Sequence, residues 1–598
     1  MRLKQHRGAL LNRVKALNVA TQAILLIIAG AYWSVQIAGG PRYRELADNN
    51  RLRKLLIEAP RGLIQDRQGR PLVENAPSYS LYIDRTRSAD LEKSLDFAAE
   101  ILDQERNALA EVLEGYRRVP RFKPVLMAER LSLSQAARFD VQSLEYPEFE
   151  VEVEQIRLYR HAHQTAHLLG YQGEVSDREL AQPESPYRPG DLVGKKGVER
   201  RYEGYLRGER GEQVVVVDSR GRRIEEAQRD PAAAGRDLRL TLDLDLQQEA
   251  AIQLADKVGA IVALDPQKGE ILALVSSPSF DPNRFARRLR SDEWKELLEN
   301  PDHPLQNRTI QNVYPPGSVF KMVMALAALD LGLVDVNSTR SWCPGHSKIY
   351  NNTYRCWKAG GHGWVDLYRS LEGSCNVFYH QLGQKMEIDT IARYARRFGF
   401  GQRTGLDLEG EKSGLVPSQE WSLKARRTPW YPGETISVST GQGPILVTPL
   451  QVAVMVAAIA NGGYLVTPHL SREAEPPPPK PLDVRPEHLT LIREGMRRVV
   501  HGTQGTGYRA GVEDLEMAGK TGTAQVITQK RRTDNEDLPE KLRDHAWFAS
   551  FAPFDDPKIV VVVFVEHGGA GSTSAAPLAK AMYEKFLDTD LAPPRAAG

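Results

Sequence analysis

The longest apolar stretch of the chain lies near its N-terminus and predicts one membrane-spanning helix. Residues 16–41 carry no charge, and their centre, AILLIIAGAYW, belongs to an uncharged stretch longer than the about 20 residues that cross a bilayer. Five basic residues and no acidic residue precede it, which places the tail 1–15 in the cytoplasm and the chain after residue 40 outside. The pattern therefore predicts a single-pass protein of the cytoplasmic (inner) membrane with its anchor at 16–38.

A cleaved signal peptide is the alternative for this stretch, because its most apolar part is short and IAGG is similar to a processing site. Tyr32 and Trp33 favour the uncleaved anchor, since such side chains prefer the membrane interface. Later apolar runs, such as IVVVVFV at 559–565, are too short to span a bilayer and predict buried strands.

Beyond the anchor, the apolar and polar positions divide the chain into two predicted domains. Residues 39–235 mix short strand-like pieces with amphipathic stretches near 91–139 and are rich in arginine and glutamate. This composition predicts an elongated pedestal that serves as a spacer. Near residue 236 the pattern of apolar and polar residues changes, which predicts a catalytic domain over 236–588 and a tail over 589–598.

The predicted catalytic domain has strand patterns at both ends and helical periodicity between them. GAIVALDPQKGEILALVSSP predicts a hairpin that turns at residues 266–269. MAGKTGTAQV, AWFASFAP and IVVVVFVEHG predict strands near the C-terminus, and TPLQVAVMVAAIANGG is typical of a helix between the two strand groups. The pattern predicts an α/β (α+β) domain whose sheet joins strands that are distant in the sequence.

Length and charge limit the class of protein. At 598 residues the chain is long enough for two or three domains and for a large enzyme. Lysine and arginine (79) nearly balance aspartate and glutamate (77), and no basic stripe of domain size occurs, which argues against a nucleic-acid partner.

A hydroxyl and an amine stand at the start of an apolar helix pattern in YPPGSVFKMVMALAAL, residues 314–329. Ser318 and Lys321 are three residues apart, so both side chains project from one helical face. Pro316 and Gly317 place Ser318 in the first turn, where free backbone N–H groups favour an oxyanion. Ser318 needs a base to become a nucleophile, and Lys321 serves as that base when burial lowers its pKa. Alone, the pair also fits a helix cap beside a solvated lysine.

A second motif follows in LEGSCNVFYHQLG, at a predicted transition from loop to helix. Ser374 can pass a proton between Lys321 and the leaving amine of a substrate. Asn376 can hold an amide group of the substrate's side chain.

A third motif lies in the strand pattern MAGKTGTAQV. Lys520, once close to the lysine of the first motif, would lower the pKa of that lysine by repulsion and offer a counter-charge for a terminal carboxylate. Thr521 and Thr523 can bind the same carboxylate, and Gly522 lets an extended peptide lie against the strand. The backbone N–H groups of Ser318 and Thr523 are the expected oxyanion donors.

The three motifs, in this order, are typical of the penicillin-interacting acyl-serine enzymes. Together with the anchor and two pedestal segments, RGLIQDRQGRPL (61–72) and GVERRYEGYLRGERG (197–211), they cover almost the whole chain. The chain therefore resembles a class B penicillin-binding protein. CWKAGGHG, just before SCN, is similar to the elongation, or rod-shape, branch of that family.

This resemblance implies a penicillin-binding, serine β-lactamase-like transpeptidase domain, with a mostly antiparallel sheet flanked by helices, on a dimerisation-like pedestal. It also implies a D-Ala-D-Ala transpeptidase that cross-links peptidoglycan stem peptides through an acyl-enzyme on Ser318. β-Lactams would then be covalent inhibitors, and a membrane glycan polymerase of the RodA type would be the partner.

Two other readings of the motifs remain open. A D-Ala-D-Ala carboxypeptidase or a β-lactamase shares the same fold and differs in whether water or an amine takes the acyl group. No Glu-x-x-Leu-Asn stretch lies between Ser374 and Lys520, so trapping of a β-lactam is expected instead of its turnover. A penicillin-sensing receptor or an inactive scaffold that regulates a polymerase is the alternative from a different functional class.

The cysteines of the chain gather close to the second motif. Cys343, Cys356 and Cys375 fall within 33 residues, with His362 among them. Three thiolates and one imidazole would complete a tetrahedral zinc site that braces the loop carrying Ser374. The resemblance also implies metal ligands in this loop. A Cys343–Cys356 disulfide with Cys375 buried and free is the alternative.

Overall fold

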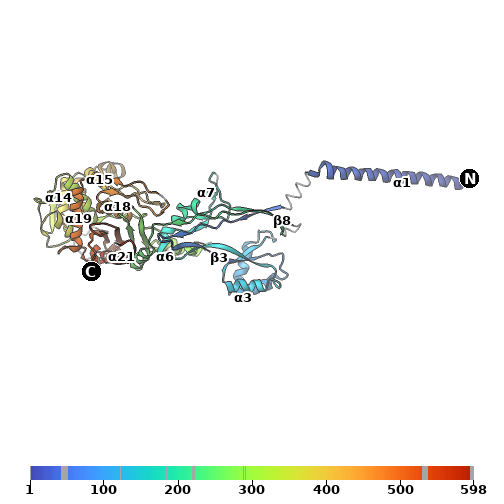
Figure 1. The fold of residues 1–598 in the computed structure, drawn as a ribbon, viewed down its shortest axis with the longest axis horizontal. Coiled ribbons are helices and arrows are strands. Elements are labelled where there is room, and N and C mark those ends of the chain that lie inside the picture. Colours follow the sequence, from blue (N-terminus) through green and yellow to red (C-terminus); the bar gives the residue numbers. More distant parts are fainter. Residues whose placement is uncertain are drawn as a thin grey trace. The chain divides into compact units, whose positions relative to one another are not determined.

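The helices and strands of the chain are drawn in Figure 1, a computed structural model. It describes all residues except 1, 42–51, 122, 184, 218–222, 287–288, 290, 474, 528–536 and 593–598. The chain divides into two compact units, Met1–Arg61 with Arg207–Arg236, and Gly62–Leu206 with Asp237–Gly598. The end of the predicted tail, 593–598, lies outside the described residues.

The first unit contains the apolar helix predicted at the N-terminus. Helix α1 spans Arg2–Trp33 and continues into a π-helical turn, Ser34–Ala38, so the helix begins well before the predicted anchor. Among the described residues, only Leu11–Ala38 is both long and apolar enough to cross a membrane, with a mean hydropathy of 1.7. The unit also holds an antiparallel sheet in the order β1-β8-β9, formed by β1 (Leu52–Ile57), β8 (Gly211–Val217) and β9 (Arg223–Asp230).

The pedestal residues of the second unit form a sheet around the long strand β3, Pro71–Ile83, which pairs with β5, Phe149–Tyr159. The amphipathic stretches near 91–139 are helices, as their periodicity predicts. These helices and the strand between them are α3 (Leu91–Leu102), α4 (Arg106–Gly115), β4 (Val125–Leu131) and α5 (Leu133–Val141). Their apolar faces pack together with β3 and β5 in one core.

The predicted catalytic domain is built on an antiparallel sheet in the order β12-β11-β21-β20-β19. Its strands are β11 (Gly259–Leu264), β12 (Ile271–Ser277), β19 (Ala518–Ala524), β20 (His545–Ala552) and β21 (Ile559–Val565). The predicted hairpin is β11–β12, and β11 pairs with β21, about 300 residues later. The prediction of a sheet that joins sequence-distant strands is confirmed.

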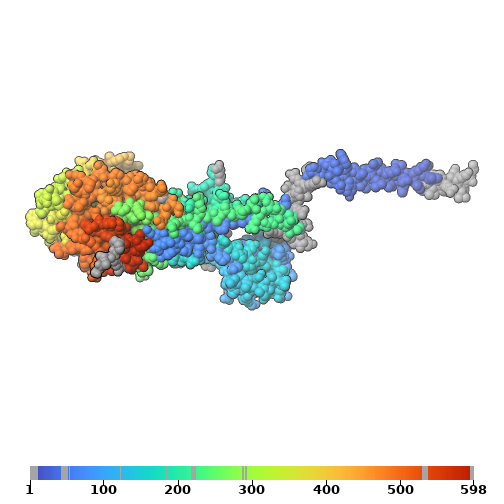
Figure 2. All heavy atoms as spheres, viewed as in Figure 1, coloured from blue at the N-terminus to red at the C-terminus, as the bar shows by residue number. Residues whose placement is uncertain are grey.

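Helices cover both faces of this sheet. Alternate residues of β21 face opposite cores, so Val560 and Val562 pack with α18 (Pro449–Ala460), whereas Val561 and Val563 pack with α21 (Ala576–Leu587). Because both faces are buried, the strand reads as a continuous apolar run without polar alternation. Figure 2 shows these C-terminal residues, coloured orange to red, packed into one lobe.

Candidate active site

Ser318 lies in one turn of 3-10 helix, which is followed directly by a buried α-helix. The 3-10 turn η3 is Gly317–Phe320, and α12 is Lys321–Asp330. Gly317 has a φ of +55°, and a Cβ atom there would lie 2.4 Å from the carbonyl oxygen of Thr523. Only glycine allows the backbone beside Ser318 to approach strand β19 this closely.

The amine of Lys321 is fully buried and faces the second motif. Its Nζ donates to Ser374 O at 2.8 Å and to Asn376 Oδ1 at 2.7 Å, and it lies 3.2 Å from Ser374 Oγ. Burial lowers the pKa of Lys321 to about 8, although nearby cysteine thiolates favour its charged form. A lysine with this pKa is neutral in a useful fraction of molecules near neutral pH, as a base for Ser318 must be.

The second motif lies at a transition from loop to helix, as predicted. Helix α13 spans Leu367–Glu372, and α14 spans Asn376–Lys385. Ser374 between them has a φ of +52°, a left-handed conformation that costs energy for a residue with a side chain. Asn376 Nδ2 donates to Arg355 O at 3.2 Å, which holds its amide while Oδ1 accepts from Lys321.

The third motif lies on β19, an edge strand of the sheet. Lys520 is fully buried, and its Nζ donates to Thr521 O at 3.0 Å. Burial lowers the pKa of Lys520 well below its usual value, and the charge of Lys321 lowers it further. The two amines are therefore close enough to repel each other, and the expected lowering of the Lys321 pKa by Lys520 stays a prediction.

Strand β19 packs directly against the turn that carries Ser318. A Cβ atom at Gly522 would lie 2.9 Å from Val319 Cγ2 and 2.8 Å from Trp547 Cβ. Ser318 thus lies between two residues, Gly317 and Val319, that both contact β19. The structure brings the three motifs into one region, with these predicted residues: Ser318, Lys321, Ser374, Asn376, Lys520, Thr521, Gly522 and Thr523. The chemical roles assigned to them stay predictions.

Two further side chains contact β19 and are missing from the predicted set. Thr506 Oγ1 lies 2.7 Å from Thr521 Oγ1, and Gln442 Nε2 donates to Thr523 O at 3.0 Å. The sequence signal at Gln442 is the run Gly-Gln-Gly at 441–443, in which both glycines have positive φ. A lone threonine in a loop gives no comparable signal.

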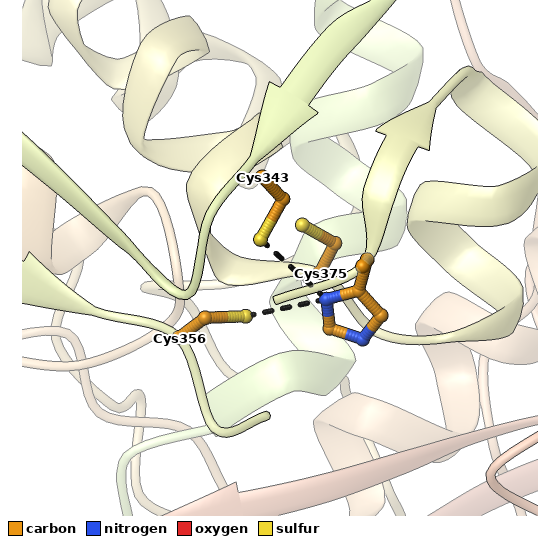
Figure 3. Close-up of side chains that lie close together, drawn as sticks. Cys343, Cys356 and Cys375 are labelled. Carbon is orange, nitrogen blue, oxygen red and sulfur yellow. Dashed lines mark hydrogen bonds between the residues drawn. The ribbon is translucent and has the colours of Figure 1, made fainter. Parts of the chain in front are cut away.

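The cysteines of the chain and His362 form a cluster beside the second motif. Their ligand atoms all lie within 4.8 Å of one another, and Figure 3 shows the thiols and the imidazole directed at a common centre. His362 Nδ1 lies 3.6 Å from Cys343 Sγ and 3.5 Å from Cys356 Sγ. Cys375, the third thiol, is the central residue of the Ser-Cys-Asn motif. Three sulfurs and one imidazole nitrogen match the donor set of a tetrahedral zinc site.

The Cys343–Cys356 disulfide that the sequence left open is absent: Cys343, Cys356 and Cys375, all described and buried, are free thiols. The physical reason is that the sulfurs of Cys343 and Cys356 both face the imidazole of His362. The contact between the two thiols lowers the pKa of Cys356 and raises the pKa of Cys375.

An antiparallel sheet flanked by helices, with a serine and lysine turn against its edge strand, is the penicillin-binding protein transpeptidase fold. Residues 259–584 match the family described as "Penicillin binding protein transpeptidase domain". Residues 56–240 match the "Penicillin-binding Protein dimerisation domain". The chain belongs to the penicillin-binding protein transpeptidase family.

Named relatives share most of the chain. The peptidoglycan D,D-transpeptidase MrdA of Haemophilus influenzae is 35% identical over 596 residues, which cover 96% of this chain and 91% of that protein. The solved PBP2 in a complex with MreC from Helicobacter pylori has a TM-score of 0.80 and 28% identity, and the match covers 90% of this chain and 99% of that chain. The crystal structure of Pseudomonas aeruginosa PBP2 in complex with WCK 5153 has a TM-score of 0.68 and 32% identity, with 90% and 97% covered.

Proposed function

We propose that this chain is a peptidoglycan D,D-transpeptidase that cross-links stem peptides during cell-wall elongation. The observation that carries the proposal is the buried amine of Lys321, which contacts Ser374 and Asn376 one helical turn from Ser318. The relatives that match almost the whole chain include peptidoglycan D,D-transpeptidases named MrdA. This match fits the elongation branch of the family that the sequence resembles.

The first half of the reaction is acylation. Ser318 Oγ attacks the carbonyl carbon between the two D-Ala residues, and its proton passes to the neutral amine of Lys321. The C–N bond of the scissile peptide breaks, and Ser374 relays the proton from Lys321 to the departing amine of the terminal D-Ala. The product is an ester between Ser318 and the stem peptide.

The second half of the reaction transfers the acyl group. An amine from a neighbouring stem peptide attacks the ester carbon and gives a proton back through Ser374 and Lys321, so Ser318 leaves with its hydroxyl restored. Attack by water instead would give a D-Ala-D-Ala carboxypeptidase. We predict that the acyl group is transferred to the amine more often than to water.

Binding of the donor peptide falls to β19. Lys520, Thr521 and Thr523 offer an amine and two hydroxyls for the terminal carboxylate. The missing side chain of Gly522 leaves room for Val319 and Trp547, so the turn of Ser318 lies directly against the strand on which an extended peptide would bind. The N–H groups of Ser318 and Thr523 bind the oxyanion that develops at the attacked carbonyl.

The substitution Ser318→Ala tests the proposal. We expect the variant to fold and to lose all covalent labelling by a fluorescent penicillin, because the attacking oxygen is gone. The matched control is Ser338→Ala, at an exposed hydroxyl, which should label like the wild type. Labelling that survives in Ser318→Ala means that the nucleophile is another residue.

Cys343, Cys356, Cys375 and His362 are the residues that would hold a zinc ion. The donor set fits, because its ligand atoms converge within 4.8 Å and the three cysteines are buried free thiols. The ion would cross-link the loop that carries Ser374 and supply stability. Metal analysis and thiol titration of the unfolded, chelated protein should give one zinc and three thiols. No zinc and one thiol contradict the site.

A single N-terminal anchor with the tail 1–15 in the cytoplasm would place both domains outside the inner membrane. This topology rests on the apolar helix Leu11–Ala38 and on the basic residues that precede its uncharged core. It suits a partner in the membrane, a glycan polymerase of the RodA type, with β-lactams as covalent inhibitors of the outer domain. A protease added outside intact spheroplasts should remove the catalytic domain and spare an N-terminal tag.

A further inference from the structure

We propose that Gln442 is a positioning residue for acylation: its carboxamide fixes the edge of β19 so that the backbone N–H of Thr523 stays directed at Ser318. The inference deepens the proposed function and rests on it. Gln442 lies outside the three motifs. Its proposed role is to position the backbone of β19, and the residues of the three motifs carry out the reaction.

The carboxamide of Gln442 takes the place of a neighbouring strand. Its Nε2 donates to Thr523 O at 3.0 Å, and its Oε1 accepts from Gln525 N at 3.2 Å. These two backbone groups lie two residues apart on one edge of the strand, the spacing that an adjacent strand would pair with. One side chain thus closes the edge of β19 just beyond the third motif.

The direction of the Thr523 N–H group follows from this contact. In an antiparallel strand the N–H and C=O of one residue point to the same edge. Because Thr523 O points to Gln442, its N–H points to that edge too, which is the edge that η3 occupies. A Cβ atom on Gly317, next to Ser318, would lie 3.2 Å from Thr523 N.

The turn that presents Gln442 also contacts the residue before Ser318. Gly441 O accepts from Gly317 N at 2.9 Å, and a Cβ atom on Gly441 would lie 2.0 Å from Gly317 O. Residues 441 and 442 therefore contact the backbone just before Ser318 and just after the N–H of Thr523. A turn that contacts the backbone next to both donors can set the distance between them, on which oxyanion stabilisation depends.

The opposite edge of the same sheet provides a matched control. On β12, Gln247 Oε1 accepts from Leu274 N at 2.8 Å, and its Nε2 donates to Leu274 O at 3.1 Å. This glutamine pairs its carboxamide with an edge strand as Gln442 does, far along the sheet from Ser318. Loss of its hydrogen bonds should cost stability without changing acylation.

The experiment compares wild type, Gln442→Met and Gln247→Met by stopped-flow with a fluorescent penicillin. It separates the dissociation constant of the initial complex from the rate constant of acylation, and thermal unfolding is measured in parallel. We expect Gln442→Met to acylate about 10- to 100-fold more slowly, with initial binding changed less than about threefold. Gln247→Met should unfold at a lower temperature and acylate at the wild-type rate.

The second variant Gln442→Glu keeps the acceptor for Gln525 N and loses the donor to Thr523 O, so it should be slowed as well. Acylation at the wild-type rate in both Gln442 variants overturns the inference, as does weaker binding with an unchanged rate constant. An equal slowing in Gln247→Met shows a general loss of structure and overturns it too. Wild-type protein that forms no adduct defeats the proposed function itself.

Discussion

The two edge strands of the catalytic sheet, β12 and β19, have opposite surroundings. Every residue of β12 is buried, and Gln247 and its helix α10, Leu244–Gln253, cover its outer edge. At β19 the outer edge faces the turn of Ser318, and Gln442 pairs with it only at its end. An edge strand is a hazard in most proteins, because another chain can pair with it. Under the proposed function, β19 uses its edge to bind the donor peptide.

The two edges also differ in their buried amines. Buried charged residues beside β12 include Asp243 and Arg308, whereas Lys321 and Lys520 are both fully buried beside β19. Burial of an amine costs free energy unless its pKa falls, and both lysines show that fall. Perturbed lysines that gather at one edge of a sheet indicate selection for chemistry there, at the expense of stability.

The substitution Lys321→Met should have the largest effect on acylation at the β19 edge. Removal of the buried base should slow acylation by a penicillin about 1000-fold, within the usual range for a general base. The control is Lys268→Met at the exposed turn between β11 and β12, which should change nothing. Stopped-flow acylation measures both, and a Lys321→Met variant that acylates normally would remove the lysine from the mechanism.

Gly522→Ala should have the next largest effect. The added methyl group would lie within 3.0 Å of Val319 and Trp547 and would push the turn of Ser318 away from β19. We expect acylation to slow about 10- to 100-fold. The reverse change on the other edge, Ala273→Gly, should cost about 1 kcal/mol of stability and leave acylation intact. Equal acylation by the two variants would show that the edges do not differ in function.

Removal of the zinc ion proposed for the cysteine cluster should have a smaller effect. Chelation should free the loop over 341–376 that carries Ser374 and Asn376, and acylation should slow about tenfold because second-motif contacts to Lys321 loosen. Hydrogen exchange should rise in that loop and stay unchanged in β12. Faster exchange in both regions would mean global unfolding, and no change in either would argue against a bound ion.

The smallest effect concerns pH. Lys321 must be neutral to accept the proton of Ser318, and a lysine with a pKa of about 8 loses its proton as the pH rises through 8. Acylation should therefore rise about fivefold between pH 7 and pH 8 and level off above. An acylation rate that keeps rising tenfold per pH unit beyond pH 9 would indicate an ordinary exposed lysine as the base.

Local patterns in the sequence predicted much of the fold and of the site. Apolar runs marked β11, β12, β20 and β21, and the order of Ser318, Ser374 and Lys520 marked the candidate catalytic residues. The features that these sequence patterns missed depend on contacts between residues that are distant in the sequence. The role of Gln442 follows from its contact with β19, about 80 residues later, and no spacing in the sequence shows that contact. The choice between a disulfide and four convergent ligands likewise depended on where the sulfurs point.

Proximity of Lys321 and Lys520 follows from the motifs, and the two amines are close enough to repel each other in the structure. The effect of the cysteines on the charge of Lys321 does not follow from the motifs, because only the folded chain fixes the position of the cysteine cluster. The domain boundary near residue 236 stays a prediction.

Mass spectrometry of the protein after a brief exposure to penicillin tests the central assignment most directly. The account predicts one adduct per chain, on the peptide that contains Ser318, and an acyl-enzyme that persists for much longer than it takes to form. An adduct on any other residue, or no adduct on a folded protein, would contradict it.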